Sequence, residues 1–208
     1  MTLNSDNCSV VSFRKTITPV TFDYHVAGQL LNRQQSAKDL GVLLRHDLNS
    51  EDHVRYVCGK AFRMLGMLSR VSRHLRDPHT LRAIYSAHVQ PFLEYSSAVW
   101  APHQDYLRQD LQRVQRKFIR IVGFRMGFNY DEVPVSDLER ALNVNSLEER
   151  RDVQDAMFLF KLVTSAIDSP FLLERVSFIC HGRTRSMELF ARRNHNSSLE
   201  ANCTMQRV

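Results

Sequence analysis

Apolar residues recur every three or four positions over most of residues 51–122, and this spacing is the period of an amphipathic α-helix. The first such stretch follows Ser50, a suitable N-cap, and places Glu51 and Asp52 favourably in its first turn. Its apolar side carries Val54, Val57, Ala61, Leu65, Leu68, Val71 and Leu75. A helix is therefore predicted from Ser50 to about Leu75, with one side buried in a bundle.

Two prolines divide the next part of the chain. Asp77-Pro78 combines an N-cap with proline at the first helical position, which predicts that a second helix begins there. Pro91 lacks the N–H that a helix interior requires, so we expect it to kink or break this helix.

A third helix is predicted from about Asp105 to Gly123, which should end it. The sequences "SDLE" (136–139) and "SLEE" (146–149) match the capping-box pattern, and they predict a short helix and a long helix. The long helix should continue through Ala156, Phe160 and Val163, and one last short helix should follow Ser169-Pro170.

The first 48 residues have a different character. Three short runs rich in Val, Phe, Tyr and Leu, at residues 8–13, 20–26 and 40–44, are separated by turn-forming residues and predict a small antiparallel sheet. The predicted fold class is therefore α+β and mostly α-helical. We divide the chain into strands (1–48), a basic helical bundle (49–125), an acidic helical segment (126–180) and a tail expected to be disordered (181–208).

The stretch "PFLEYSSAVWAP" (91–102) contains the single tryptophan of the chain. Beyond the expected break at Pro91, we predict that Phe92, Tyr95, Val99 and Trp100 turn inward as core residues, together with Phe118 of the third helix. A role for Trp100 as a platform on which bases stack is the alternative.

The charge of the chain is unevenly distributed. The net charge is +6, and residues 51–125 hold 13 basic and 6 acidic side chains, whereas residues 126–180 hold 5 basic and 10 acidic ones. The basic residues form two stripes, apart from the apolar sides of the first and third helices. The first stripe is Lys60, Arg63, Arg70 and His74, and the second is Arg113, Arg116, Lys117 and Arg120. Such a distribution is typical of a surface that binds nucleic acid.

Several function classes lack their sequence signals. The chain has no Gly-rich phosphate loop, no Gly-X-Ser-X-Gly elbow and no His-Glu-X-X-His pair. Its four cysteines form no Cys-X-X-Cys pair, and the Cys180-His181 and His195/Cys203 groups match no known metal-ligand spacing, so no metal site is expected. There is no signal peptide and no apolar run of membrane-spanning length, which predicts an intracellular protein, nuclear or cytoplasmic, that is not secreted and does not bind membranes.

Five stretches carry a family resemblance. They are "TLNSDNCSVVSF", "KDLGVLL", "RMLGMLSRVSRHLRDPHTLRAIY", "VQPFLEYSSAVWAP" and "LQRVQRKFIRIV". In this order and spacing, over about residues 3–175, they resemble the closing third of the reverse transcriptase of non-long-terminal-repeat retrotransposons, notably the jockey-like elements.

The resemblance implies roles for particular segments. "LNSDNCSVVSF" matches the palm strand after the catalytic hairpin, where the family usually has Lys before the cysteine and this chain has Asn7. "KDLGVLL" matches the primer grip, which makes Leu40 and Gly41 primer-grip-like, and residues 51–122 match the thumb that holds the template–primer duplex. The implied phosphate contacts are Lys60, Arg63, Arg70, Arg73, Arg113, Arg116, Lys117 and Arg120.

The family's Tyr-X-Asp-Asp hairpin and an earlier aspartate, which hold two Mg²⁺ ions, precede the part that matches Thr2. The resemblance therefore implies a truncated fragment with no catalytic residue, no metal site and no cofactor. Such a fragment would not be an enzyme on its own, but it would keep a weak affinity for an RNA or DNA duplex. The alternative is a helical protein-interaction module without a nucleic-acid role, in which the acidic 126–180 segment recruits a partner.

Overall fold

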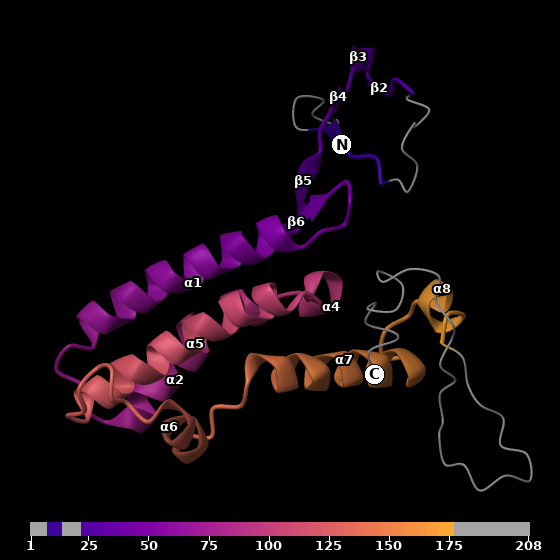
Figure 1. Cartoon of the computed structure of the whole chain (residues 1–208). Coiled ribbons are helices and arrows are strands. Elements are labelled where there is room, and N and C mark those ends of the chain that lie inside the picture. Colours follow the sequence, from indigo (N-terminus) through magenta and orange to yellow (C-terminus); the bar gives the residue numbers. More distant parts are fainter. Residues whose placement is uncertain (1–7, 14–21, 177–208) are drawn as a thin grey trace, which may run out of the picture.

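The fold is α+β and mostly helical, as predicted. A computed structural model describes residues 8–13 and 22–176, and the expected disordered tail, Cys180, His181, His195 and Cys203 lie outside these ranges. The long helices α1 (Glu51–Val71), α2 (Pro78–His88) and α5 (Asp105–Arg125) lie along one another (Figure 1). The strands extend from the start of α1, and α7 (Leu147–Val163) lies on the far side of α5 from α1.

Helix α1 begins where the sequence predicts it and ends about one turn early. Ser50 occupies the N-cap position without a capping bond from its side chain, and Asn49 Oδ1 accepts the Glu51 N–H at 2.9 Å instead. At the other end, the buried Ser72 donates to the Leu68 carbonyl from both its N–H (2.9 Å) and its hydroxyl (2.7 Å). Val71 is 78% exposed and Leu75 is 39% exposed, so their predicted place on the buried side is wrong.

Pro78 and Pro91 each lie in the first turn of a helix. The Asp77 side chain accepts the N–H groups of His79 and Thr80, which confirms the predicted N-cap of α2. Helix α2 ends at His88, and Pro91 lies in the first turn of α3 (Gln90–Glu94), where its missing N–H costs no hydrogen bond. The break therefore precedes Pro91.

The core is built around α5. Its residues Leu107, Leu111, Val114, Phe118 and Val122 are fully buried in a cluster that includes residues of α1 and α2. At the centre, the Phe118 ring stacks on the Tyr85 ring of α2 with 4.1 Å between centroids and 12° between planes. Complete burial of each such side chain contributes about 1.5–3 kcal/mol, so this face dominates the stability of the bundle.

Helix α4 (Ser97–Trp100) inserts the tryptophan into the core. Trp100 is 4% exposed, and its Nε1–H donates to the Tyr95 carbonyl at 2.7 Å. Ser96, with φ of 54°, reverses the chain between α3 and α4, so that Tyr95 and Val99 face outward at 57% and 65% exposure. The prediction is therefore confirmed for Trp100 and Phe118 and wrong for Tyr95 and Val99.

The strands pair in three separate two-stranded units, not in one antiparallel sheet. Strand β1 (Ser9–Val10) is parallel to β4 (Asn32–Arg33), and β2 (His25–Val26) is antiparallel to β3 (Gln29–Leu30). The longest pairing joins β5 (Ser36–Asp39) to β6 (Val42–Arg45) in an antiparallel hairpin. Its two-residue turn has φ of 43° at Leu40 and 91° at Gly41, the left-handed values that tight hairpins use.

The β5–β6 hairpin is attached to the helices through His53. The Leu43 N–H donates to His53 Nδ1 at 3.1 Å, which places the imidazole proton on Nε2. The His53 ring is 1% exposed and lies 4.7 Å from the Trp100 ring. Burial, with a smaller effect of the Lys60 charge, lowers the pKa of His53 from 6.5 to about 4. The hairpin therefore depends on a neutral histidine.

Two capping predictions have opposite outcomes. Ser146 and Glu149 form the reciprocal bonds of a capping box at the start of α7, as predicted. Helix α6 (Val135–Ala141) instead begins after Pro134, so Ser136 is not its N-cap. The predicted last helix is present as α8 (Pro170–Leu173).

Gly123 does not end α5, contrary to the prediction. The helix continues to Arg125, and Gly123 is buried where the chain crosses back over it. A Cβ atom at Gly123 would lie 2.4 Å from Val133 Cγ1 and 3.2 Å from Leu138 Cδ1. The residue is therefore required for close packing of the segment that leads into α6.

The first prediction concerns the loss of stability at acidic pH. Since the folded pKa of His53 lies below the unfolded value, the unfolded chain binds the proton first as pH falls. The free energy of unfolding should therefore fall from pH 6.5 to about pH 4, by about 1.4 kcal/mol per pH unit from this group. Urea denaturation followed by circular dichroism measures this slope.

His53→Asn keeps an acceptor for the Leu43 N–H and removes the titration, so its slope over this range should be smaller. An unchanged slope in this variant would show that other groups cause the loss.

The second prediction concerns Gly123. Gly123→Ala should destabilise the protein by about 1–3 kcal/mol, because the added methyl group overlaps Val133. The double variant with Val133→Ala should lose less than the sum of the two single variants, as measured by urea denaturation. Additive losses would mean that the two side chains do not compete for the same space.

Candidate nucleic-acid interface

Helix α5 presents its basic residues opposite its buried face. Arg113, Arg116, Lys117 and Arg120 are all exposed, as predicted from their spacing. Arg113 forms an ion pair with Asp110 at 3.1 Å, whereas no ion pair is found for Arg116, Lys117 and Arg120 within the described residues. Three cations on this helix are therefore available to an anionic ligand.

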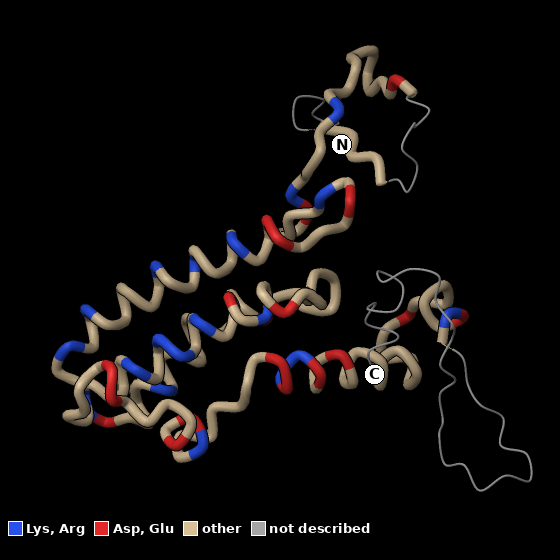
Figure 2. The backbone as a smooth tube through the Cα atoms, viewed as in Figure 1, with Lys and Arg blue, Asp and Glu red and all other residues tan. Residues whose placement is uncertain are grey.

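Helix α1 also carries exposed cations. Arg63 and Arg70 are exposed on α1, which packs along α5, and Figure 2 shows basic residues along both helices. Lys117 of α5 lies over the Phe62 ring of α1, with 5.4 Å from Nζ to the centroid. We define the basic face as the exposed residues Arg113, Arg116, Lys117 and Arg120 of α5.

Aromatic side chains border the end of the basic face. The Arg120 guanidinium lies 5.7 Å from the Tyr130 ring centroid, and Phe124, one turn further along α5, is 58% exposed. Flat rings beside guanidinium groups are the combination on which nucleic-acid bases stack. The α5 end of the basic face therefore offers both charge and stacking surfaces.

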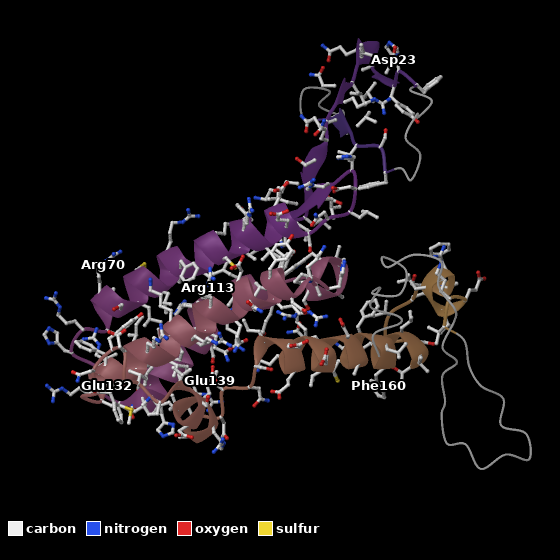
Figure 3. All side chains as sticks on the ribbon, in the orientation of Figure 1. Asp23, Arg70, Arg113, Glu132, Glu139 and Phe160 are labelled. Atoms are coloured by element: carbon white, nitrogen blue, oxygen red, sulfur yellow. The ribbon has the colours of Figure 1, made fainter. Side chains whose placement is uncertain are left out.

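The other sequence-predicted site residues lie elsewhere. Arg73 is exposed beyond the end of α1, and Arg70 projects from the outer edge of α1 (Figure 3). Lys60 is not part of the basic face, because its Nζ lies over the Tyr56 and Phe92 rings, at 4.5 and 5.9 Å.

Leu40 and Gly41, the primer-grip-like residues, form the tip of the β5–β6 hairpin. Leu40 is 85% exposed, and its carbonyl accepts the Tyr95 hydroxyl at 3.0 Å. The exposed Tyr95 therefore fixes the hairpin tip and does not fill the core.

Arg125 joins the last turn of α5 to the end of α1, and the sequence analysis missed it. Its guanidinium donates to the carbonyls of Ser69 (2.8 Å) and Arg73 (2.7 Å), at the end of α1. These carbonyls have no partner within a helix that stops there, so a cation is favourable at this position. The position of Arg125 in the last turn of α5 was the available sequence signal.

A second group of polar contacts attaches α7. Arg150 pairs with Glu94 of α3 through Nε, and also through Nη2 at 3.0 Å. Gln154 donates to Glu94 at 3.2 Å and accepts the Ser97 hydroxyl at 2.7 Å. Arg150 and Gln154 therefore attach α7 to α3 and α4, and no feature of the spacing of these residues predicts it.

Neither a metal-holding group nor a membrane-spanning helix is found among the described residues. No group of three or more His, Cys, Asp or Glu side chains in that part of the chain is placed to hold a metal ion. None of the described helices is both long enough and apolar enough to cross a membrane.

Comparison with known proteins does not assign a family. No family model matches the sequence, and neither curated proteins nor solved structures give a match. The function proposed below is therefore inferred from the residues and their geometry.

The third prediction concerns Arg125. Arg125→Gln should lower the free energy of unfolding by about 1–3 kcal/mol, because two carbonyls lose a charged donor. Hydrogen exchange of the amides at the end of α1 should accelerate more than exchange in α2. Arg116→Gln, on the same helix but exposed and without an ion pair, is the control, and it should change stability by less than about 0.5 kcal/mol. Equal effects of the two variants would show that Arg125 does not hold α1.

Proposed function

We propose that the protein binds the sugar–phosphate backbone of nucleic acid through the basic face. The observation that carries the proposal is the alignment of Arg116, Lys117 and Arg120 on the exposed side of α5, where none of the three has an ion pair within the described residues. Contacts of this kind position a duplex and do not read its sequence. Binding should therefore be weak, sensitive to salt and independent of sequence.

The dimensions of the basic face support this proposal. Arg113 and Arg120 are seven residues apart, which is about 10 Å along the helix axis. One strand of B-DNA rises about 3.4 Å per nucleotide, so α5 alone can follow about three phosphates.

We also propose that this surface is the thumb of a retrotransposon reverse transcriptase, as its resemblance to the jockey-like family implies. The printed sequence contains no Tyr-X-Asp-Asp motif, and it therefore lacks the carboxylates that would hold Mg²⁺. The role proposed for this chain is holding a template–primer duplex, without polymerase activity of its own and in an intracellular compartment.

One observation favours the second candidate, a protein-interaction module. Helix α7 buries Leu147, Leu159 and Leu162 on one side and exposes Val153, Met157 and Phe160 on the other. Phe160, 62% exposed, points away from the other helices (Figure 3). An apolar stripe of this kind on an exposed helix is typical of partner binding.

The fourth prediction separates the two candidates. Replacing Arg116, Lys117 and Arg120 with Gln removes three charges while keeping good helix formers. Affinity for an RNA–DNA duplex should fall at low salt, and the slope of log K against log salt should decrease by up to about 2.7. Fluorescence anisotropy over a salt series measures both quantities.

The matched control replaces Arg140, Lys161 and Arg175, three exposed cations outside the basic face. It should reduce the slope much less than the triple variant of α5. Equal losses in both variants would point to non-specific attraction by net charge. Absence of binding at low salt by the folded protein would favour the interaction module.

A further inference from the structure

A second cationic cluster lies apart from the basic face, where the β5–β6 hairpin meets α1 and α3. Lys38 of β5 donates to the Tyr56 hydroxyl of α1 at 3.0 Å. The Lys60 ammonium, one turn further along α1, lies 4.5 Å from the centroid of the same ring. Phe92 of α3 also lies under the Lys60 ammonium, with 5.9 Å from Nζ to the ring centroid, so three segments distant in sequence meet around Tyr56 and Lys60.

The two ammonium groups are not neutralised inside the described part of the protein. No carboxylate of the described residues lies within 4.0 Å of Lys38 or Lys60 as an ion-pair partner. Two acids at the start of α1 are engaged with arginines, since Glu51 pairs with Arg55 at 2.5 Å and Asp52 with Arg45 at 3.4 Å. The rings beneath the lysines hold both cations close to the same hydroxyl.

The local electrostatics agree with this geometry. The lysines lower the pKa of the Tyr56 phenol to about 8, first through the hydrogen bond from Lys38. The Lys60 charge also contributes to the low pKa of His53, after burial, so the field of this ammonium extends to the neighbouring imidazole. A site that favours a phenolate favours other compact oxyanions for the same reason.

We propose that Lys38, Tyr56 and Lys60 form a binding site for a dianionic phosphate monoester group. Two ammonium charges match the two charges of such a group, whereas a backbone phosphodiester carries one. The phenol supplies a neutral hydrogen-bond donor between the two cations. The ligand can be a free phosphate compound or the terminal phosphate of a nucleic-acid strand, because both present the same group.

The charged states of the site define a pH range for binding. A phosphate monoester becomes fully dianionic above its second pKa of about 6. Above about pH 8 the Tyr56 phenol is ionised, loses its donor and repels the ligand. His53, with a pKa of about 4, is neutral throughout this range. Affinity should therefore be greatest near neutral pH.

Calorimetric titration with inorganic phosphate and with phenyl phosphate, at constant ionic strength, tests the site in the full chain. The wild-type protein should bind both, and Lys38→Gln/Lys60→Gln should bind at least about tenfold more weakly, because two charge-assisted bonds are lost. Lys161→Gln/Arg175→Gln removes two exposed charges that lie outside both cationic surfaces, and it should leave phosphate affinity unchanged. Absence of phosphate binding by the wild type, or equal losses in the two variants, would overturn the proposal.

A titration of the Tyr56 phenol tests the site even if the Lys38→Gln/Lys60→Gln variant fails to fold. Bound phosphate shares the ammonium groups with the phenolate, so it should raise the pKa of Tyr56 above about 8. The difference in tyrosinate absorbance between the wild type and Tyr56→Phe isolates this group from the other tyrosines. If phosphate shifts this titration no more than chloride at the same ionic strength does, the site is not a phosphate site.

The source of the phosphate is distinguished with a short single strand carrying either a 5′-phosphate or a 5′-hydroxyl. Tighter binding of the phosphorylated strand, lost in Lys38→Gln/Lys60→Gln, assigns the site to strand ends. Equal binding of the two strands, with phenyl phosphate still bound, assigns it to small phosphate compounds. Neither result depends on the basic face, so this proposal can fail while the proposed backbone binding stands.

Discussion

Burial of one side of α5 against α1 and α2 holds the helical part of the protein together. Helices α3, α6 and α7 each pack against one of these three. The stacked rings of Tyr85 and Phe118 lie at the centre, and a continuous group of apolar residues extends from Val42 of the hairpin to Leu147 of α7. The segments described as basic and acidic by their sequence therefore share one core, in spite of their different charges.

The same burial determines where the charges can go. A helix that commits one side to the core leaves the opposite side to water, and on α5 that side carries four cations within eight residues. Repulsion between them is limited by Asp110, and by the rings of Phe62 and Tyr130 beneath two of them. The proposed binding surface thus results from burial of the opposite side of α5, and these contacts limit the destabilisation that repulsion between its cations would cause.

Local signals in the sequence were sufficient for features that depend on neighbouring residues. Capping residues predict the starts of α2 and α7. The helical period of apolar residues predicts both the buried side of α5 and its exposed basic stripe. The errors arise from contacts between distant segments. Gly123 resembles a helix end but is required where Val133 crosses it, and Tyr95 resembles a core aromatic but reaches the hairpin tip.

The candidate sites divide in the same way. The α5 stripe could be predicted because it lies on one helix. Lys60 lies apart from the α5 stripe, over Tyr56 of its own helix and Phe92 of α3. The contact with Phe92 and the proximity of Lys38 to Tyr56 depend on tertiary structure that spacing does not give. The pairing of the two-residue strands could not be predicted either, because two residues are too few to show the alternating hydrophobic pattern of a strand.

Tyr95 adds a further connection between the hairpin and the helical core, beside the bonds made by His53 and Tyr56. Its backbone carbonyl accepts the indole N–H of Trp100, while its side-chain hydroxyl donates to the Leu40 carbonyl at the hairpin tip. A displacement of the tip therefore alters the surroundings of the single tryptophan, which lies in the core. We therefore expect the fluorescence of Trp100 to respond when the hairpin moves, so that no added label is needed to follow it.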